Sequence, residues 1–326
     1  MSMQPLTSMA LRCLALMLLS AAAFAGDPQH RFVIFGDSLS DPGNYYFIYR
    51  QVSEPPFAPI PSAPYDERGH RFTNGRTWIE LLTFEMGVPE SGRPAFVRPG
   101  VFTNYAVGRA RARPNAPAFA PYDLGTQVAA FLGDFGGKAP RDATFVIWIG
   151  ANDLDDSLAA AQSDPAQSAV ILESALSAVA SNIQLLWAAG ARQFLVPNLP
   201  DLGVTPAVQS LGQPAVTVAT QLSGGYNDNL ARTLSQLRQL PGIKIASLDV
   251  FTFLDAVVAD PAAYGIKDAE TPCLRFFVTV DPICARPDKH LFWDAIHPTE
   301  AGHRVLEHAA EQALGSKKAW ASKESA

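Results

Sequence analysis

Short apolar runs recur along the chain, and between them apolar residues return every three or four positions. The runs at Arg31–Phe35, Ala143–Ile149, Gln193–Pro197 and Ile243–Val250 are mostly apolar. Such runs are typical of parallel strands that are buried on both faces. A weaker run at Phe102–Ala106 adds a further candidate, so the chain predicts a sheet of about five strands.

The longer stretches between these runs predict helices. Pro165–Ala189 begins with a proline that suits a first helical turn, and Gly190 suits the position just past a helix end. Thr299–Leu314 predicts a closing helix, and another is marked by an apolar stripe of Tyr226, Leu230, Leu234 and Leu237. Strands that alternate with helices in this way indicate a doubly wound α/β sheet.

Two regions interrupt this alternation. Glu54–Pro64 is rich in proline, and Ala95–Pro121 mixes arginine, proline and aromatic residues. We expect both to be long surface loops near the strand ends, which either build the substrate site or are ordinary solvated connections. The chain shows no internal repeat and no linker, so residues 26–326 are expected to form one domain.

The first 25 residues have the features of a secretory signal peptide. Leu11–Phe24 is almost wholly apolar apart from Arg12, and Ala23-Phe24-Ala25 matches an A-x-A cleavage pattern. The alternative is an N-terminal membrane anchor, but the apolar run is short for spanning a bilayer. We therefore expect cleavage after Ala25 and a mature protein that is secreted or periplasmic.

Composition and charge narrow the range of partners. The chain has 326 residues, of which 48% are hydrophobic and 17% charged, and this favours a sizeable core over disorder. The net charge of −6 becomes −7 when Arg12 leaves with the signal peptide, so we expect no nucleic-acid partner. Neither composition nor charge indicates an oligomeric state.

Cysteine usage and missing motifs exclude several kinds of site. Cys13 lies in the predicted signal peptide, and in an oxidising compartment Cys273 and Cys284 are expected to form a disulfide; the alternative is two buried thiols. The chain has no further cysteine and no H-E-x-x-H string, so no metal site is predicted. It also lacks a phosphate-binding glycine loop and a dinucleotide fingerprint, so no cofactor is predicted.

Candidate chemistry gathers at the predicted strand ends. Ser38 follows the strand at Arg31–Phe35, and Asn152 follows the strand at Ala143–Ile149. The carboxyl ends of parallel strands meet at one edge of a sheet, so we expect both side chains on the same rim. A helix that begins after Ser38 would also present free N–H groups to an anion there.

A serine nucleophile needs a base within hydrogen-bond reach. His297 is the best candidate because imidazole titrates near neutral pH, and Asp294, three residues earlier, can orient the ring. Taken singly, Ser38 and Asn152 could be helix caps, and the Asp–His spacing could arise by chance. Their joint occurrence predicts a serine esterase. No G-x-S-x-G string occurs, so an α/β-hydrolase is disfavoured.

Four motifs occur in order along the chain. They are Gly36-Asp37-Ser38-Leu39, followed by Asp41, Gly43 and Asn44; Asn104-Tyr105-Ala106-Val107-Gly108; Gly150-Ala151-Asn152-Asp153; and Asp294-Ala295-Ile296-His297-Pro298. Together they resemble the motifs of the GDSL, or SGNH, hydrolases. The resemblance implies a three-layer αβα sandwich with a flavodoxin-like, doubly wound parallel sheet of about five strands. It also implies Ser38, Asp294 and His297 as catalytic residues, and an oxyanion hole made by Ser38, Gly108 and Asn152.

Further strings are similar to secreted bacterial lipolytic members of this family. They are RFTNGRTW at Arg71–Trp78, NLPDLG at Asn198–Gly203, Phe292-Trp293, and a cysteine loop just upstream of it. Such relatives include phospholipases, lysophospholipases, haemolysins and glycerophospholipid–cholesterol acyltransferases.

The segment after the second motif departs from the family pattern. Arg109 follows Gly108 where a second glycine is common, and a positive φ at that position would strain Arg109. Arg109, Arg111 and Arg113 form a basic stretch. It either attracts a phosphate or carboxylate headgroup or, as we favour, is a solvated loop.

The sequence as a whole predicts a secreted serine esterase or lipase that acts through an acyl-enzyme on Ser38. Aromatic and proline-rich loops suit acyl chains, so lipid or fatty-acyl esters are the first choice of substrate, with transient contact to a membrane surface. A carbohydrate acetyl-esterase and an acyltransferase of the same fold are alternatives. An alternative from another class is a secreted binding module without turnover.

Overall fold

The structure is a computed structural model that describes residues 31–51, 56–57, 69–114 and 122–315. The predicted signal peptide at residues 1–25 lies outside these ranges. Of the proline-rich region at Glu54–Pro64, only Pro56 and Phe57 are described.

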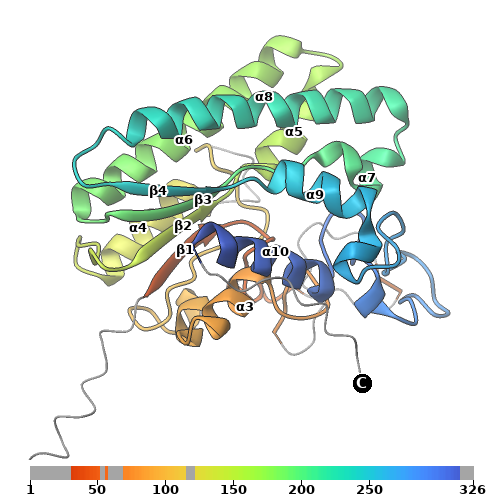
Figure 1. Cartoon of the computed structure of the whole chain (residues 1–326), viewed down its shortest axis with the longest axis horizontal. Coiled ribbons are helices and arrows are strands. Elements are labelled where there is room, and N and C mark those ends of the chain that lie inside the picture. The colour runs from red at the N-terminus through yellow and green to blue at the C-terminus, as the bar shows by residue number, and fades with distance from the viewer. Residues whose placement is uncertain (1–30, 52–55, 58–68, 115–121, 316–326) are drawn as a thin grey trace, which may run out of the picture. The chain divides into compact units, whose positions relative to one another are not determined.

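Four parallel strands form the sheet (Figure 1). They are β1 (Phe32–Gly36), β2 (Thr144–Trp148), β3 (Gln193–Pro197) and β4 (Lys244–Leu248), and they lie side by side in that order. β2, β3 and β4 fall within predicted apolar runs, and β1 extends one residue past its run, to Gly36, which confirms the parallel α/β sheet. β1 and β2 are in register with Gly36 opposite Trp148, so the segments that follow them leave the sheet at the same edge.

The weaker strand predicted at Phe102–Ala106 is reduced to isolated bridges at one residue. Asn104 pairs in parallel with Ile34 of β1 and with Pro94. The Ile34 N–H donates to Thr103 O (2.9 Å), and the Tyr105 N–H donates to Ile34 O (2.7 Å). The segment therefore takes the place of a fifth strand beside β1, on the edge that β2 leaves free, and completes the flavodoxin-like order.

The prediction of a surface loop at Ala95–Pro121 is wrong for residues 102–112, most of which are buried. They are buried because they cover the edge of β1 and satisfy its backbone groups. Residues 115–121 lie outside the described ranges.

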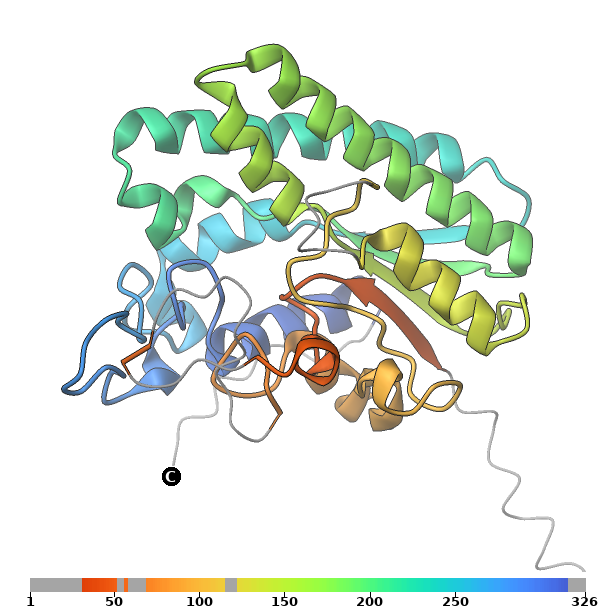
Figure 2. The ribbon, with the colours of Figure 1, turned by 180° about the vertical axis from the view of Figure 1, so that it is seen from behind.

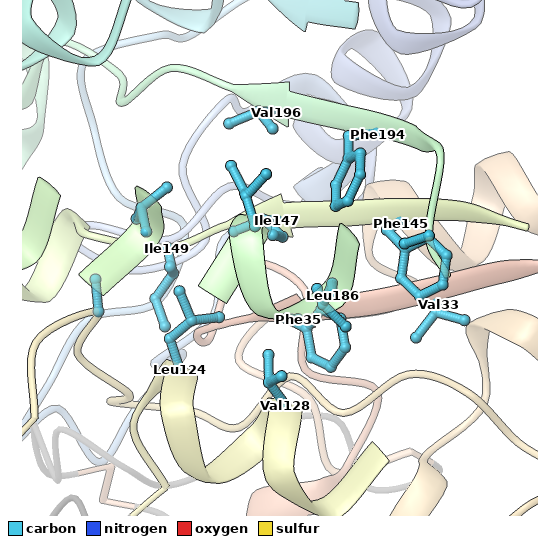
Figure 3. Packing of buried hydrophobic residues seen from close by; sticks show 14 of the residues in the cluster. Val33, Phe35, Leu124, Val128, Phe145, Ile147, Ile149, Leu186, Phe194 and Val196 are labelled. Atoms are coloured by element: carbon cyan, nitrogen blue, oxygen red, sulfur yellow. The ribbon is translucent and has the colours of Figure 1, made fainter. Parts of the chain in front are cut away.

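One face of the sheet is covered by α4 (Leu124–Asp134), α5 (Ala151–Ala161), α6 (Pro165–Ala189) and α8 (Gln213–Leu237), as Figure 1 shows. Every second strand residue points toward these helices, because side chains alternate along a strand. The resulting core is drawn in Figure 3 and includes Val33, Phe35, Phe145, Ile147, Phe194 and Val196 from the strands, with Leu124, Val128 and Leu186 from the helices.

The opposite face is covered by α3 (Trp78–Glu85) and α10 (Glu300–Ala313), and the view from behind in Figure 2 shows the same layers. The remaining strand side chains form a second core there, made of Phe32, Ile34, Val146, Trp148, Leu195 and Leu248 with Trp78, Leu82, Leu306 and Ala310. Helices on both faces of a parallel sheet confirm the three-layer αβα sandwich.

The remaining elements connect these layers. α9 (Val250–Ala259) follows β4, and two short helices are α2 (Asn44–Tyr49) and α7 (Pro206–Gln209). The 3-10 turns are η2 (Pro89–Gly92), η3 (Ala95–Val97), η4 (Leu202–Val204), η5 (Pro261–Tyr264) and η6 (Pro287–Lys289).

Helix α6 has the predicted bounds. The Asp164 side chain accepts the Gln167 N–H (3.0 Å) at its start, and Gly190 follows its end with φ 124°. By length and composition, α6 could cross a membrane, and no other described helix meets the same criterion. Its inner side belongs to the core through Ala175, Val179, Ile183 and Leu186.

Cys273 and Cys284 form the expected disulfide. The bond closes a hairpin in which Leu274 bridges Ile283 in antiparallel fashion. The Leu274 N–H donates to Trp293 O (2.6 Å), so the hairpin is attached directly before Asp294.

Candidate active site

Ser38 lies in a tight turn directly after β1. Asp37 stabilises this turn: its Oδ1 accepts the Leu39 N–H (3.1 Å), and its backbone carbonyl accepts the Ser40 N–H (3.1 Å). Among the residues that the structure describes, the Ser38 N–H donates no hydrogen bond. The turn therefore fixes Ser38 at the sheet edge with both its hydroxyl and its amide available.

The helix expected to begin directly after Ser38 begins later, at Asn44. Its first N–H groups are occupied, because the buried Asp41 carboxylate accepts from Gly43 (2.8 Å), Asn44 (2.6 Å) and Tyr45 (3.0 Å). The predicted anion site at this helix start is therefore wrong, since an internal carboxylate takes the place of an anion.

A chain of hydrogen bonds joins Ser38, His297 and Asp294. Ser38 Oγ lies 2.9 Å from His297 Nε2, and His297 Nδ1 lies 2.8 Å from Asp294 Oδ2. The second Asp294 oxygen accepts the N–H of Ile296 (2.9 Å) and of His297 (2.7 Å). The Asp-x-x-His spacing thus closes a turn in which the carboxylate holds both the backbone and the ring of His297.

Phe72 packs against the His297 ring. Their ring centroids are 5.5 Å apart, and Phe72 is fully buried. A Cβ atom on Gly108 would lie 2.3 Å from the Phe72 ring, so only glycine fits at position 108. The glycine of the second motif therefore permits a close approach of backbone and ring beside His297.

Asn152 lies in the first turn of α5, on the same sheet edge as Ser38. Gly150 adopts φ 127°, which lets the chain turn sharply from β2 into this helix. Asn152 Nδ2 donates to Ala110 O (3.0 Å). An amide nitrogen carries two hydrogens, so this bond orients the group and leaves a second donor.

Gly108 is placed near the site, but its N–H is occupied. It donates to Asp41 Oδ2 at 2.7 Å. Arg109 has φ 65°, so the positive φ considered for this position is present and is adopted by an arginine. The strain is of the order of 1 kcal/mol or more for a residue with a Cβ atom.

Both interpretations of the basic stretch are wrong for Arg111 and Arg113, which form internal ion pairs. Arg113 contacts Asp153 (2.7 Å) and Asp156 (2.6 Å), and Arg111 contacts Asp156 (2.9 Å). The Ala112 N–H also donates to Asp153 Oδ2 (2.7 Å). These contacts fasten the segment after Gly108 to the helix that carries Asn152, and they neutralise the positive charge.

Two buried carboxyl groups in the Ser38 turn have perturbed acidity. Burial raises the pKa of Asp37 to about 7, although the Leu39 N–H and nearby His297 act in the opposite direction. Burial also raises the pKa of Asp41 to about 6, against the effect of the N–H groups that it accepts. Asp37 therefore changes charge near neutral pH, close to His297.

An apolar cavity of about 260 Å³ opens beside Ser38 and His297. An apolar part of its wall comes from α7, α9 and α10 and includes Val208, Phe253, Leu254, Val257, Val305 and Leu306. Sequence reasoning identified no substrate-binding residue, and none of these belongs to a motif. The sequence of α9 carried a usable signal. This helix is apolar on nearly every side, and one core face covers only one side of a helix, so a second apolar environment beside α9 is expected.

A family model described as GDSL-like lipase/acylhydrolase matches residues 32–310, which span the sheet and all four motifs. The chain belongs to this family. Membership makes the protein a carboxylic-ester hydrolase, as predicted.

Two curated relatives of the family align with most of the chain. A GDSL esterase/lipase of Arabidopsis thaliana is 26% identical over 311 residues, 84% of this chain and 84% of the relative. The phosphatidylcholine-sterol acyltransferase of Aeromonas hydrophila is 27% identical over 322 residues, 86% of this chain and 88% of the relative. Among solved structures, a catalytic mutant of an acetylxylan esterase from Geobacillus stearothermophilus is similar, with a TM-score of 0.48 and 14% identity over 88% of this chain and 95% of that chain.

Three side chains that could ligate a metal lie together outside the cavity beside Ser38. Within the described ranges, Glu307, His308 and Glu311 of α10 place their ligand atoms within 4.8 Å of one another. None of the three lines the catalytic cavity. The Ser38–His297–Asp294 group is built from a hydroxyl, an imidazole and a carboxylate.

Proposed function

We propose that the protein is a serine esterase that acts through an acyl-enzyme on Ser38. The observation that carries the proposal is the continuous hydrogen-bond chain from Ser38 Oγ through His297 to Asp294. Ser38 Oγ attacks the ester carbonyl while His297 Nε2 takes its proton, and the proton then passes to the departing alcohol. Water repeats the sequence on the acyl-enzyme and releases the acid.

The oxyanion that forms during attack needs preorganised donors. We propose the Ser38 N–H and the remaining amide hydrogen of Asn152 as two of them, since both lie at the sheet edge beside the nucleophile. Gly108 is the third proposed donor. Because its N–H donates to Asp41 Oδ2 here, that bond must open before Gly108 can take part.

The proposed substrate is a lipid or fatty-acyl ester. Its support is the cavity beside Ser38, whose wall is apolar along α9 and α10. Burial of an acyl chain there is favoured by about 0.8 kcal/mol per methylene, so longer chains gain binding energy that an acetyl group lacks. A carbohydrate acetyl-esterase would leave this volume unused.

Secretion and brief contact with a membrane surface are part of the proposal. The disulfide suits an oxidising compartment, and residues 1–25 have the pattern of a signal peptide. The hairpin that this disulfide closes exposes Phe277 (70%) and Val280 (73%). Apolar side chains at that position can enter a lipid interface while Ser38 remains accessible to the ester.

A fluorophosphonate probe tests the catalytic role directly. Covalent labelling of the wild type and loss of labelling in Ser38→Ala would support the acyl-enzyme mechanism, whereas folded wild type that takes no label would support a binding module. Nitrophenyl acetate and nitrophenyl laurate, assayed side by side, test the substrate class. A preference for acetate alone would replace the lipid proposal with the acetyl-esterase alternative.

Transfer to an alcohol is a second candidate reaction, because one relative is named as an acyltransferase. It uses the same acyl-enzyme with an alcohol in place of water. Product analysis with an added alcohol separates the two: accumulation of the new ester supports transfer, and release of free acid alone supports hydrolysis.

A further inference from the structure

A second cavity, of about 590 Å³, lies between α2, residues 69–71 and the region from α3 to η3. It shares no lining residue with the catalytic cavity. Four arginines line it, Arg50, Arg71, Arg76 and Arg93, together with one carboxylate, Glu80. The cavity therefore carries three net positive charges in a chain whose overall charge is −6.

The one carboxylate is already committed to Arg71. Arg71 Nη2 lies 2.6 Å from one Glu80 oxygen, and Arg71 Nε donates to the other at 2.7 Å. Glu80 also accepts the Thr77 N–H (3.1 Å) at the start of α3. In the described part of the chain, Arg50, Arg76 and Arg93 have no carboxylate partner, so their charge is left for a ligand.

The three remaining guanidinium groups are held against aromatic rings. Arg50 lies over Phe47 (5.1 Å to the centroid), Arg76 over Phe84 (5.1 Å) and Arg93 over Phe102 (5.4 Å). A guanidinium stacked on a ring keeps its N–H donors free along its edge. Stacking also restricts the side chain before a ligand arrives, so less conformational entropy is lost on binding.

We propose that this cavity binds the phosphate group of a small phosphate monoester. A dianionic phosphate accepts several charge-assisted hydrogen bonds, and the guanidinium edge matches it in bidentate fashion. The volume lies within the range of about 300–1,000 Å³ that is usual for small-molecule sites. The proposal is independent of the esterase mechanism.

The test is isothermal titration calorimetry of the whole protein with glycerol 3-phosphate at low salt. We expect saturable binding that weakens as ionic strength rises, because partly exposed ion pairs are screened. The Arg50→Ala/Arg93→Ala double variant should bind at least about tenfold more weakly, since one lost charge-assisted hydrogen bond already costs that factor. Arg304→Ala, an exposed arginine paired with Glu300 on α10, is the matched control and should retain the wild-type affinity.

The phosphate could belong to a free metabolite or to a lipid headgroup, and a second arm separates these sources. Arginine-dependent binding of glycerol 3-phosphate supports a soluble ligand. Arginine-dependent sedimentation with vesicles that contain phosphatidic acid, without binding of glycerol 3-phosphate, supports a lipid headgroup. Absence of both, or equal binding by the double variant, overturns the proposal.

A folding control keeps the test decisive. Thermal unfolding by circular dichroism shows whether the double variant is folded, and if it is not, the single variant Arg76→Ala takes its place. The titration involves no ester turnover, so inactivity toward esters would leave its result intact, and failure to bind phosphate would leave the esterase proposal standing.

Discussion

The Arg113 guanidinium lies 2.7 Å from the fully buried carboxylate of Asp153, which directly follows Asn152 in the sequence. The same carboxylate accepts the Ala112 N–H. The contacts join the segment after Gly108 to the first turn of α5, so two of the proposed oxyanion donors are positioned by one ion-pair network. Arg113 acts through other residues and is a positioning residue.

Arg113→Met should therefore lower both stability and turnover. Asp153 would stay buried without its cation, which costs about 3–5 kcal/mol for a buried pair. A shift of Asn152 by a fraction of its hydrogen-bond length should lower kcat by roughly 10–100-fold with little change in KM. Stopped assays and chemical denaturation measure the two effects, and Arg113→Lys should restore part of each. A variant that is less stable but has full kcat would assign Arg113 a structural role only.

Asn152→Ala should reduce kcat by about 10²–10³-fold, the usual cost of one oxyanion donor. The fold should be retained, because among the described residues the side chain makes one hydrogen bond, to Ala110 O. Asn229→Ala provides the control, since Asn229 on α8 likewise donates to a backbone carbonyl, that of Gly225, and its oxygen accepts only from the exposed Arg232 within the described ranges. Equal turnover in Asn152→Ala and the wild type would remove Asn152 from the mechanism.

Asp37 should make the free energy of unfolding depend on pH. Its pKa of about 7 in the folded state lies above the unfolded value of about 3.9, so the folded state binds the proton more tightly. This stabilising contribution is complete below about pH 4 and is lost as the pH rises through 7. Asp37→Asn removes the ionisation.

The comparison is made by denaturant unfolding of Asp37→Asn and the wild type between pH 4 and pH 8. The difference should move in favour of the variant by on the order of 4 kcal/mol as the pH rises. Asp228→Asn, an exposed residue of α8, should show no such trend. A constant difference between Asp37→Asn and the wild type would mean that Asp37 does not titrate in this range.

The strands, the sandwich and the meeting of Ser38 with His297 could be predicted because each depends on local patterns. Apolar runs mark the strand ends, and parallel strands bring their carboxyl ends to one edge, which places Ser38 and Asn152 on the same rim. His297 lies just before α10 and not at a strand end, so its meeting with Ser38, 259 positions away, is predicted by the motifs and their family resemblance. This prediction does not require knowledge of how the side chains pack.

The pairing of Arg111 and Arg113 could not be predicted in the same way. Alternating arginines look solvated in the sequence, and their partners Asp153 and Asp156 lie about 40 residues away in a helix. The direction of the Gly108 N–H and the cavity between α9 and α10 likewise depend on tertiary packing. Neither leaves a periodic pattern in the chain.

The disulfide hairpin should contribute to activity on aggregated lipid. The double variant Phe277→Ser/Val280→Ser removes two exposed apolar side chains, each worth about 1.5–3 kcal/mol when fully buried. Co-sedimentation with phosphatidylcholine vesicles should fall at least about tenfold, and so should the ratio of activity on micellar to monomeric ester. Leu185→Ser, half-exposed on α6, is the control. Unchanged vesicle binding in the double variant would show that the hairpin does not contact lipid.

Leu254→Trp should shorten the acyl chain that the site accepts. Leu254 lines the catalytic cavity from α9 and is only partly buried, so a larger side chain can turn into the cavity with little disturbance of the core. The ratio of kcat/KM for nitrophenyl laurate to that for nitrophenyl acetate should fall by roughly 10–100-fold, because several methylenes lose their apolar contacts. Val170→Trp, on the exposed side of α6 across the sheet, should keep the wild-type ratio. If Leu254→Trp also keeps that ratio, the acyl chain does not occupy this cavity, and the chain-length preference must arise elsewhere.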